Sequence, residues 1–165
     1  IDSASARYLV VHEFAHVIGG LADEYYLPNA SGPVYAGNIE PWQPNVTLSA
    51  KHAKWSVPHE SARPWNKSEY DRRFADYVRR YHALRDARAD ERVIEQLMQA
   101  EAVNQTSLLS KNKDRRAVGL FEGAHGYAKS MYRSEVDCIM FSLQSDYFCS
   151  ACSQAIDRMI SVHCG

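Results

Sequence analysis

The chain has 165 residues, of which 45% are hydrophobic and 24% charged, as expected for one soluble globular domain. The net charge of −1 and the absence of a basic block argue against nucleic acid or an anionic membrane surface as a partner. No apolar run approaches the roughly 18–20 residues that a membrane-spanning helix needs. Because Ile1 stands so close to the first motif, we expect the chain to be a piece of a longer protein. Composition does not indicate an oligomeric state.

Residues 3–19 are predicted to form the first helix. Tyr8, Val11 and Ala15 recur at three- and four-residue steps, which is the spacing of one buried helix face. Gly19 and Gly20 follow, and glycine adopts the left-handed conformation in which many helices end.

His12, Glu13 and His16 have the spacing HExxH within this helix. Positions i and i+4 lie on one face about 6 Å apart along the axis, so both imidazoles can bind one zinc ion at about 2.0–2.1 Å. Zinc brings the pKa of a bound water near ~7, and Glu13 can then take its proton and pass it to a leaving amine. The motif therefore predicts a hydrolase with one catalytic zinc ion and Glu13 as general base.

A third ligand is expected just after the helix. On a continuous helix Asp23 would lie about 10 Å further along the axis than His16, out of reach of the metal. The stop at Gly19 and Gly20 instead allows the chain to fold back and present the Asp23 carboxylate. Asp23 is the predicted third ligand, and the carboxylates that remain open as rivals are Glu24, Glu95 and Glu101.

Residues 28–64 are rich in Pro, Gly, Asn and Trp and show no sustained periodicity. We expect long ordered loops here, with tryptophans as packing anchors. The anchors are Trp42, Trp55 and Trp65, and the histidines of this stretch, His52 and His59, are expected at the surface or in loops.

A helical hairpin is predicted over residues 68–103. Ser68 and Asp90 are candidate N-caps, and apolar residues follow each of them at helical spacing. The polar stretch from Gln105 to Arg116 is predicted to be a loop.

Residues 119–141 combine glycines, aromatic residues and charges. Glycines at 119, 123 and 126 indicate tight backbone geometry near a functional wall. Glu122 and Arg133 either orient ligands or substrate or form a buried salt bridge. Tyr127 and Tyr132 are candidates for stabilising an oxyanion, and His125 is a candidate extra ligand.

The four cysteines all lie in the last part of the chain, at 138, 149, 152 and 164. Such clustering indicates either disulfides or a metal site, because Cys149 and Cys152 form a CxxC pair. We favour a disulfide from Cys138 to Cys149 or Cys152 in an extracytoplasmic protein, with a cysteine-bound second zinc as the alternative. Residues 150–163 are predicted to form a closing amphipathic helix.

Several segments together resemble the IgA-peptidase family of zinc metallopeptidases: HEFAHVIGGLADEYY, EPWQPNVT, GLFEGAHGYAKSMYR, and DCIM followed by DYFCSACSQAI. They occur in the same order, from before His12 to about Ile156. The resemblance implies one catalytic zinc, with His12 and His16 matching the zinc histidines and Glu13 the catalytic glutamate. Asp23 matches the acid of the LADEYY segment. Met140 stands where a methionine turn is expected, in a metzincin-like arrangement.

The chain departs from the family pattern in two places. Ala15 stands where the family usually has glycine, a harmless change because alanine is the best helix former. A zincin also places its β-sheet before the active-site helix, and this chain has almost nothing there. The fold implied for residues 1–165 is therefore an α+β zincin catalytic domain, helix-dominated and with its N-terminal sheet largely absent. Its parts are the active-site helix (3–19), the hairpin (68–103) and the methionine turn with the C-terminal helix (138–163).

The function implied is a zinc-dependent endopeptidase that acts on protein or peptide substrates in a secreted, periplasmic or cell-surface setting. The alternative is a catalytically inactive surface or binding module that zinc stabilises. Glu13 argues for the enzyme, because a purely structural site needs no general base.

Overall fold

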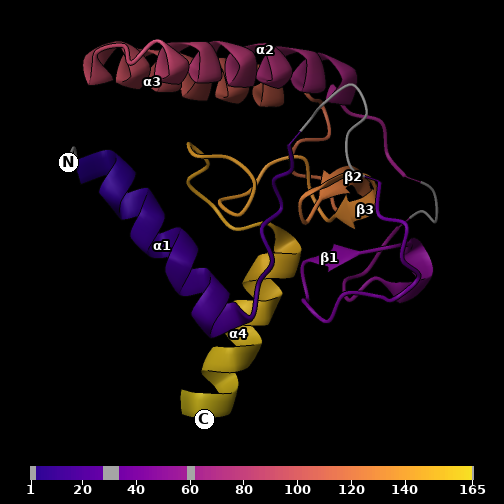
Figure 1. Ribbon diagram of the computed structural model, residues 1–165. Coiled ribbons are helices and arrows are strands. Elements are labelled where there is room, and N and C mark those ends of the chain that lie inside the picture. Colours follow the sequence, from indigo (N-terminus) through magenta and orange to yellow (C-terminus); the bar gives the residue numbers. More distant parts are fainter. Residues whose placement is uncertain (1–2, 28–33, 59–61, 165) are drawn as a thin grey trace.

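The computed structural model describes residues 3–27, 34–58 and 62–164, with only the backbone for residues 3–6. Within these ranges the chain is an α+β structure in which helix dominates and the sheet is small (Figure 1). The helices are α1 (Ser3–Gly19), α2 (Lys67–Asp86), α3 (Glu91–Ser110) and α4 (Ser150–Cys164), and a short 3₁₀ helix spans Ala50–His52. The strands are β1 (Val46–Thr47), β2 (Phe121–Ala124) and β3 (Tyr127–Arg133).

Helix α1 ends at Gly19, and Gly20 takes a φ of +60°, the left-handed conformation that the sequence predicts here. The expected buried face is only partly correct, because Ala15 is buried but Val11 is exposed. His12 lies buried beside Ala15. The remaining surface of α1 exposes the apolar side chains of Leu9, Val10, Phe14 and Val17.

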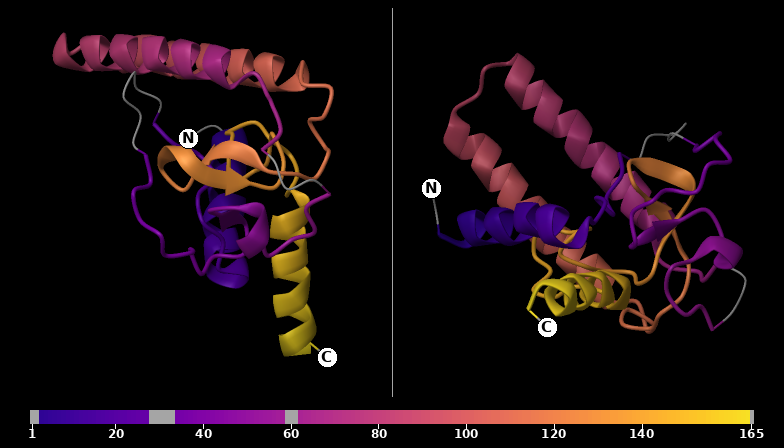
Figure 2. Two further views of the ribbon diagram at one scale, coloured as in Figure 1. Left: turned by 90° about the vertical axis from the view of Figure 1, so that its right-hand side faces the viewer. Right: turned by 90° about the horizontal axis from the view of Figure 1, so that it is seen from below.

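Helices α2 and α3 form a hairpin that lies across one end of the molecule, opposite the C-terminus (Figures 1 and 2). Asp90 caps α3 as predicted, because its side chain accepts a hydrogen bond from the Arg92 N–H at 2.8 Å. Helix α2 begins at Lys67, so Asn66 rather than Ser68 occupies its N-cap position.

Helix α3 continues to Ser110, so the prediction of a loop from Gln105 is wrong over residues 105–110. The reason is burial: Leu108 and Leu109 are almost fully enclosed by the core, which favours one more helical turn over a solvated loop. None of the helices in the described ranges has the length and apolar composition that a membrane crossing requires.

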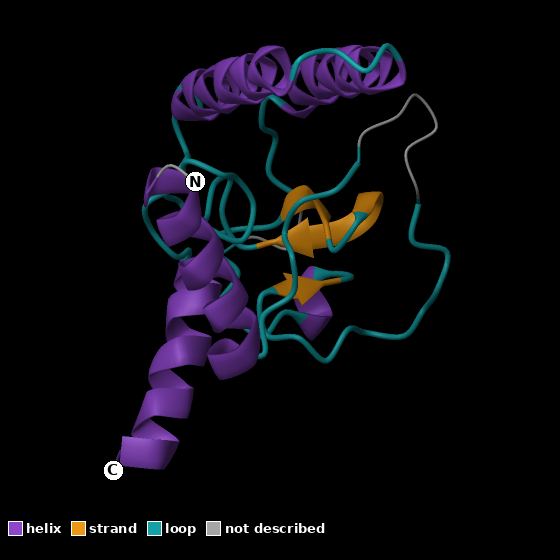
Figure 3. Cartoon of the chain, turned by 60° about the vertical axis from the view of Figure 1, so that its left-hand side comes forward, coloured by secondary structure: helices purple, strands orange, loops and turns teal. Residues whose placement is uncertain are grey.

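The three strands form an antiparallel sheet in the order β1-β3-β2, which lies beside α1 and α4 and below the hairpin in Figure 3. These strands are not evident from the sequence. Arg133 in β3 pairs with Val46 on one side and Phe121 on the other. The pairing is irregular at Gly123, whose φ of +100° is one that other residues rarely adopt.

Two of the three predicted tryptophan anchors are correct. Trp55 is buried and donates from Nε1 to the Gly119 carbonyl at 2.9 Å, and Trp65 donates to the Glu122 carbonyl at 3.0 Å. Trp42 is instead 76% exposed, so it does not anchor the loop in the interior. His52 is exposed as expected, and His59 lies outside the described residues.

Candidate metal centre and its surroundings

His12, His16 and Asp23 form a group of potential metal ligands where α1 ends and the chain turns back. His12 Nε2 lies 3.0 Å from Asp23 Oδ1 and 3.2 Å from His16 Nε2. His16 Nε2 lies 3.2 Å from the same Asp23 oxygen. The three donor atoms therefore form a nearly equilateral triangle.

This triangle has the dimensions of one face of a tetrahedral metal site. Bonds of about 2.0–2.1 Å at the tetrahedral angle place neighbouring ligand atoms about 3.3 Å apart. The outer ring nitrogens face carbonyl oxygens: His16 Nδ1 lies 2.7 Å from Leu21 O, and His12 Nδ1 lies 3.2 Å from Ile139 O. Because a carbonyl oxygen only accepts, each Nδ1 carries a hydrogen. The Nε2 atoms face Asp23, and once they lose the proton that they direct at this carboxylate they can offer their lone pairs to an ion. These residues fit a metal ion.

Asp23 is positioned by an extended segment, residues 21–27, that is held along both edges. On one edge, the N–H of Glu24 donates to the Met140 carbonyl at 2.7 Å. On the other edge, backbone N–H groups of the turn between β2 and β3 donate to the carbonyls of Asp23 and Tyr25 at 3.0 Å each. Since successive side chains of an extended segment point to opposite sides, Asp23 faces the histidines and Glu24 faces away from them.

The electrostatics of the group keep Asp23 ionised. Partial burial acts to raise the Asp23 pKa, but the hydrogen bond with His12 and the charge of His16 outweigh it, so the pKa is lowered. Burial acts to lower the pKa of His12, and the hydrogen bonds with Asp23 and the Ile139 carbonyl raise it above its ordinary value. The carboxylate is thus held in the charged form that binds a cation.

Glu13 and Tyr25 flank the group on its solvent side. The Glu13 side chain, next to His12 on α1, is exposed. The Tyr25 ring is 45% exposed and its centroid lies 6.3 Å from that of His12. Burial and the charge of Asp23 raise the pKa of Tyr25, so its hydroxyl keeps the proton that it can donate. Tyr25 was missed in the sequence, although it stands two residues after Asp23 and therefore on the same side of an extended segment.

A tight turn at residues 138–141 lies under His12. The Ile139 carbonyl accepts a hydrogen bond from the Tyr8 hydroxyl at 3.0 Å, and Tyr8 Oη also lies 3.0 Å from His12 Nδ1. Met140, the predicted methionine-turn residue, is fully buried in this turn. Tyr8 was likewise missed as a site residue in the sequence, although it stands one helical turn before His12.

Glu122 and Arg133 lie apart from the histidines. Glu122 Oε1 accepts a hydrogen bond from the Ser130 N–H at 3.2 Å, within the β2–β3 hairpin. Arg133 is fully buried and donates to backbone carbonyls, including that of Val136 at 3.0 Å. In the described part of the chain these two side chains do not form the salt bridge that the sequence left open.

The other candidate site residues of the β2–β3 hairpin also lie outside the group formed by His12, His16 and Asp23. The Tyr127 ring packs edge to face on Tyr35, with the centroids 5.0 Å apart, and Tyr132 is half-buried in β3. The His125 backbone N–H donates to the Asp23 carbonyl at 3.0 Å, but its ring is not one of the three clustered donors. His125 therefore supports Asp23 through its backbone.

Of the carboxylates considered as third ligand, Asp23 is the one whose oxygen faces both histidines. Glu24 points into a different group of side chains. Glu95 is exposed on α3, and Glu101 accepts a hydrogen bond from Gln105 on the same helix at 3.3 Å.

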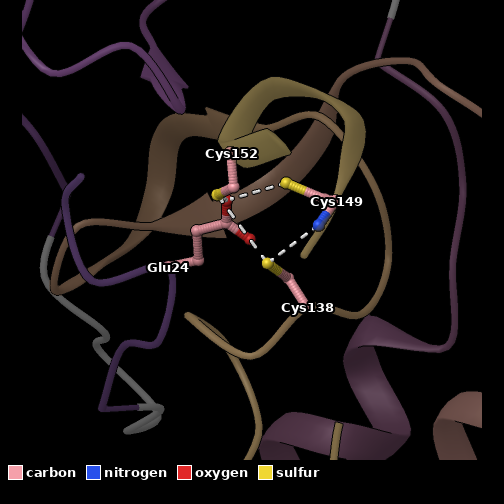
Figure 4. Close-up of side chains that lie close together, drawn as sticks. All are labelled: Glu24, Cys138, Cys149 and Cys152. Atoms are coloured by element: carbon pink, nitrogen blue, oxygen red, sulfur yellow. Dashed lines mark hydrogen bonds between the residues drawn. The ribbon is translucent and has the colours of Figure 1, made fainter. Parts of the chain in front are cut away.

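The cysteines are free thiols, so the predicted disulfide from Cys138 to Cys149 or Cys152 is wrong. The sulfur atoms of Cys138 and Cys152 are 3.8 Å apart, whereas a disulfide bond measures about 2.05 Å. These three cysteines gather instead around the Glu24 carboxylate, in a fully buried group (Figure 4). Cys164, at the end of α4, is exposed and stands apart.

Comparison with known protein families gives a match over most of the chain. The family model described as IgA Peptidase M64 matches residues 1–160, which contain the histidine group and the three buried cysteines. A search of curated proteins finds no match.

Proposed function

The chain belongs to the IgA peptidase M64 family, and from this premise we propose that it cleaves internal peptide bonds of protein substrates in a zinc-dependent reaction. The triangle of His12 Nε2, His16 Nε2 and Asp23 Oδ1 is the observation that carries this proposal. Two imidazoles and one carboxylate leave a tetrahedral ion one open position, which is typical of catalytic rather than structural zinc.

His12, His16 and Asp23 would hold the zinc ion. When bound, zinc supplies a Lewis acid that polarises the scissile carbonyl and lowers the pKa of water towards about 7. The hydrogen bonds from the two Nδ1 atoms to backbone carbonyls keep both rings in the orientation and tautomer that ligation requires.

Glu13 acts as the general base. It neighbours His12 on α1 and is exposed, so a water molecule and a substrate can both reach its carboxylate. It takes the proton of the water that attacks the carbonyl carbon and then delivers this proton to the leaving amine.

Tyr25 stabilises the oxyanion that forms on the scissile carbonyl. Its hydroxyl is protonated, its ring is half-exposed, and it lies on the same side of the extended segment as Asp23. These properties favour Tyr25 over Tyr127 and Tyr132, whose rings belong to the β2–β3 hairpin.

A fluorogenic peptide library tests the proposed activity. We expect cleavage at internal bonds that 1,10-phenanthroline abolishes and added zinc restores, because His16 and Asp23 are partly exposed and a chelator can reach the ion from their side. Binding of peptides without cleavage of any library member would favour a non-catalytic binding module instead.

We also propose a secreted, periplasmic or cell-surface location. This proposal rests on the family resemblance, since the disulfide that would have supported it is not formed. Fractionation of the source cells tests it, and recovery of the protein in the cytoplasm would contradict it.

A further inference from the structure

A second group of metal-binding side chains lies behind the histidine group. Glu24, Cys138, Cys149 and Cys152 place one carboxylate oxygen and three sulfur atoms within 4.8 Å of one another (Figure 4). All four residues are fully buried and they come from three separate parts of the chain. This group has no part in the proposed peptidase reaction.

The distances within the group are those of a tetrahedral metal site. With metal–sulfur bonds of about 2.3 Å and a metal–oxygen bond of about 2.0 Å, two sulfur atoms lie about 3.8 Å apart and sulfur and oxygen about 3.5 Å apart. In the structure, Cys138 Sγ and Cys152 Sγ are 3.8 Å apart. Glu24 Oε1 lies 3.3 Å from both Cys149 Sγ and Cys152 Sγ. The side chains therefore enclose a centre of the right size.

The backbone around the cysteines has the form of a metal-binding turn. Cys149 and Cys152 supply a CxxC pair where α4 begins. Cys138 Sγ accepts hydrogen bonds from the N–H groups of Cys149 at 3.2 Å and Met140 at 3.5 Å. Such hydrogen bonds stabilise the negative charge of a thiolate, which is the form of cysteine that binds a metal.

Two buried polar groups in this region lack the partner that burial normally demands. Glu24 Oε2 has no hydrogen-bond partner among the described residues, although Oε1 receives one from Asn45 Nδ2 at 3.1 Å. The fully buried Arg133 guanidinium lies over the rings of Phe141 and Trp65, and in the described ranges its Nε has no hydrogen-bond partner and the side chain forms no ion pair. An anionic metal–thiolate group around Glu24 would supply a counter-charge for this buried cation.

We propose that Glu24, Cys138, Cys149 and Cys152 bind a second metal ion, a zinc ion in a closed structural site. Four protein ligands leave no position for water or substrate, and three thiolates select a soft or borderline metal over magnesium or calcium. Since Asp23 and Glu24 are neighbours, one short segment supplies a ligand to each of the two sites. The second ion fixes Glu24, the turn at residues 138–141 and the start of α4 in one position, and so holds Asp23 towards the histidines.

Elemental analysis of the whole chain, purified under reducing conditions, tests this proposal. The wild type should contain two zinc ions per chain, and Cys138→Ser should lose the one that His16→Ala retains. Cys164→Ser is the matched control and should keep both, because this thiol is exposed and outside the group. A wild type with one zinc ion that Cys138→Ser keeps would overturn the second site. So would a disulfide between Cys138 and Cys152 in the mapped peptides.

Cobalt substitution of the wild type gives a second readout in case the cysteine variants do not fold. Cobalt bound by three thiolates produces an intense thiolate-to-metal charge-transfer band in the near ultraviolet, which a site of two histidines and one carboxylate cannot produce. Absence of this band in the fully cobalt-loaded protein would refute cysteine ligation. The outcome is independent of the peptidase proposal, because a chain that binds two zinc ions without cleaving peptides would contradict only the proposed function.

Discussion

Asp23 and Glu24 are adjacent carboxylates in very different surroundings. The Asp23 side chain is about one-third exposed, at 34%, and faces two imidazoles, which lower its pKa. Glu24 is fully buried among thiols, and burial raises its pKa well above the ordinary value. The difference follows from the alternation of side chains along an extended segment, which sends neighbours to opposite sides.

Glu13→Gln tests the general base. Glutamine keeps the size of the side chain but cannot accept the proton, so peptide cleavage should fall by at least about 10²-fold. Zinc content should stay at the wild-type level, because Glu13 is not one of the clustered ligands. Glu69→Gln on the exposed part of α2 is the control and should keep full activity. Wild-type turnover by Glu13→Gln would refute the assigned role.

Tyr25→Phe tests the oxyanion contact. Removing one hydrogen-bond donor to a developing oxyanion typically costs about 10²–10³-fold in kcat, and the KM should change little because the contact strengthens only in the transition state. Tyr81→Phe, in α2 and outside the ligand group, serves as the control. A rise in KM at constant kcat would show that Tyr25 binds substrate without stabilising the oxyanion.

At the scale of elements, the extended segment at residues 21–27 depends on close packing against β2. A Cβ atom at Gly123 would lie 2.3 Å from the Tyr26 ring, and Gly123 has a φ of +100°. The Tyr26 hydroxyl in turn donates to Asp71 of α2 at 2.6 Å. A side chain at position 123 would therefore push the extended segment at residues 21–27 away from β2.

Gly123→Ala should lower the free energy of unfolding by about 2–4 kcal/mol, from backbone strain and from the collision with Tyr26. Gly126→Ala is the matched control: its φ is +80°, but a Cβ atom there meets nothing within 4 Å. Strain alone should cost this variant about 1–2 kcal/mol. Chemical denaturation measures both values, and equal destabilisation of the two variants would show that the collision is unimportant.

The elements that could be predicted are those encoded by nearby residues. Helix α1 and its stop at Gly20 follow from residue spacing and glycine chemistry, as does the Asp90 cap. The strands could not be predicted in this way, because β1 and β2 are very short and β2 is interrupted at Gly123. The end of α3 depends on the burial of Leu108 and Leu109, which is a tertiary effect.

At the scale of the whole molecule, the two groups of candidate ligands differ in how far apart their residues stand in the sequence. The HExxH spacing and Asp23 lie within one short stretch, so the sequence predicted that they would meet. Glu24 and Cys149 are separated by 125 positions in the chain, and only folding brings them together. The clustering of the cysteines is visible in the sequence, but Cys149 and Cys152 form a CxxC pair without a second such pair, and this is why the sequence favours a disulfide. The Glu24 carboxylate that completes the group has no sequence signal that links it to the cysteines.

The extended segment connects the two groups and the rest of the fold. It contacts the Met140 turn on one edge and the β2–β3 turn on the other, and Tyr26 ties it to α2. We therefore expect the metal ligands and the surrounding elements to become ordered together during folding.

Zinc titration of metal-depleted protein, followed by cleavage of a fluorogenic peptide, tests the central proposal most directly. Wild-type activity should rise from the background with added zinc and reach a plateau when the histidine site is filled. His16→Ala should stay at the background at all zinc concentrations that saturate the wild type, because it lacks one corner of the ligand triangle. Full activity of the metal-free wild type, or wild-type activity of His16→Ala, would contradict a zinc peptidase centred on His12, His16 and Asp23.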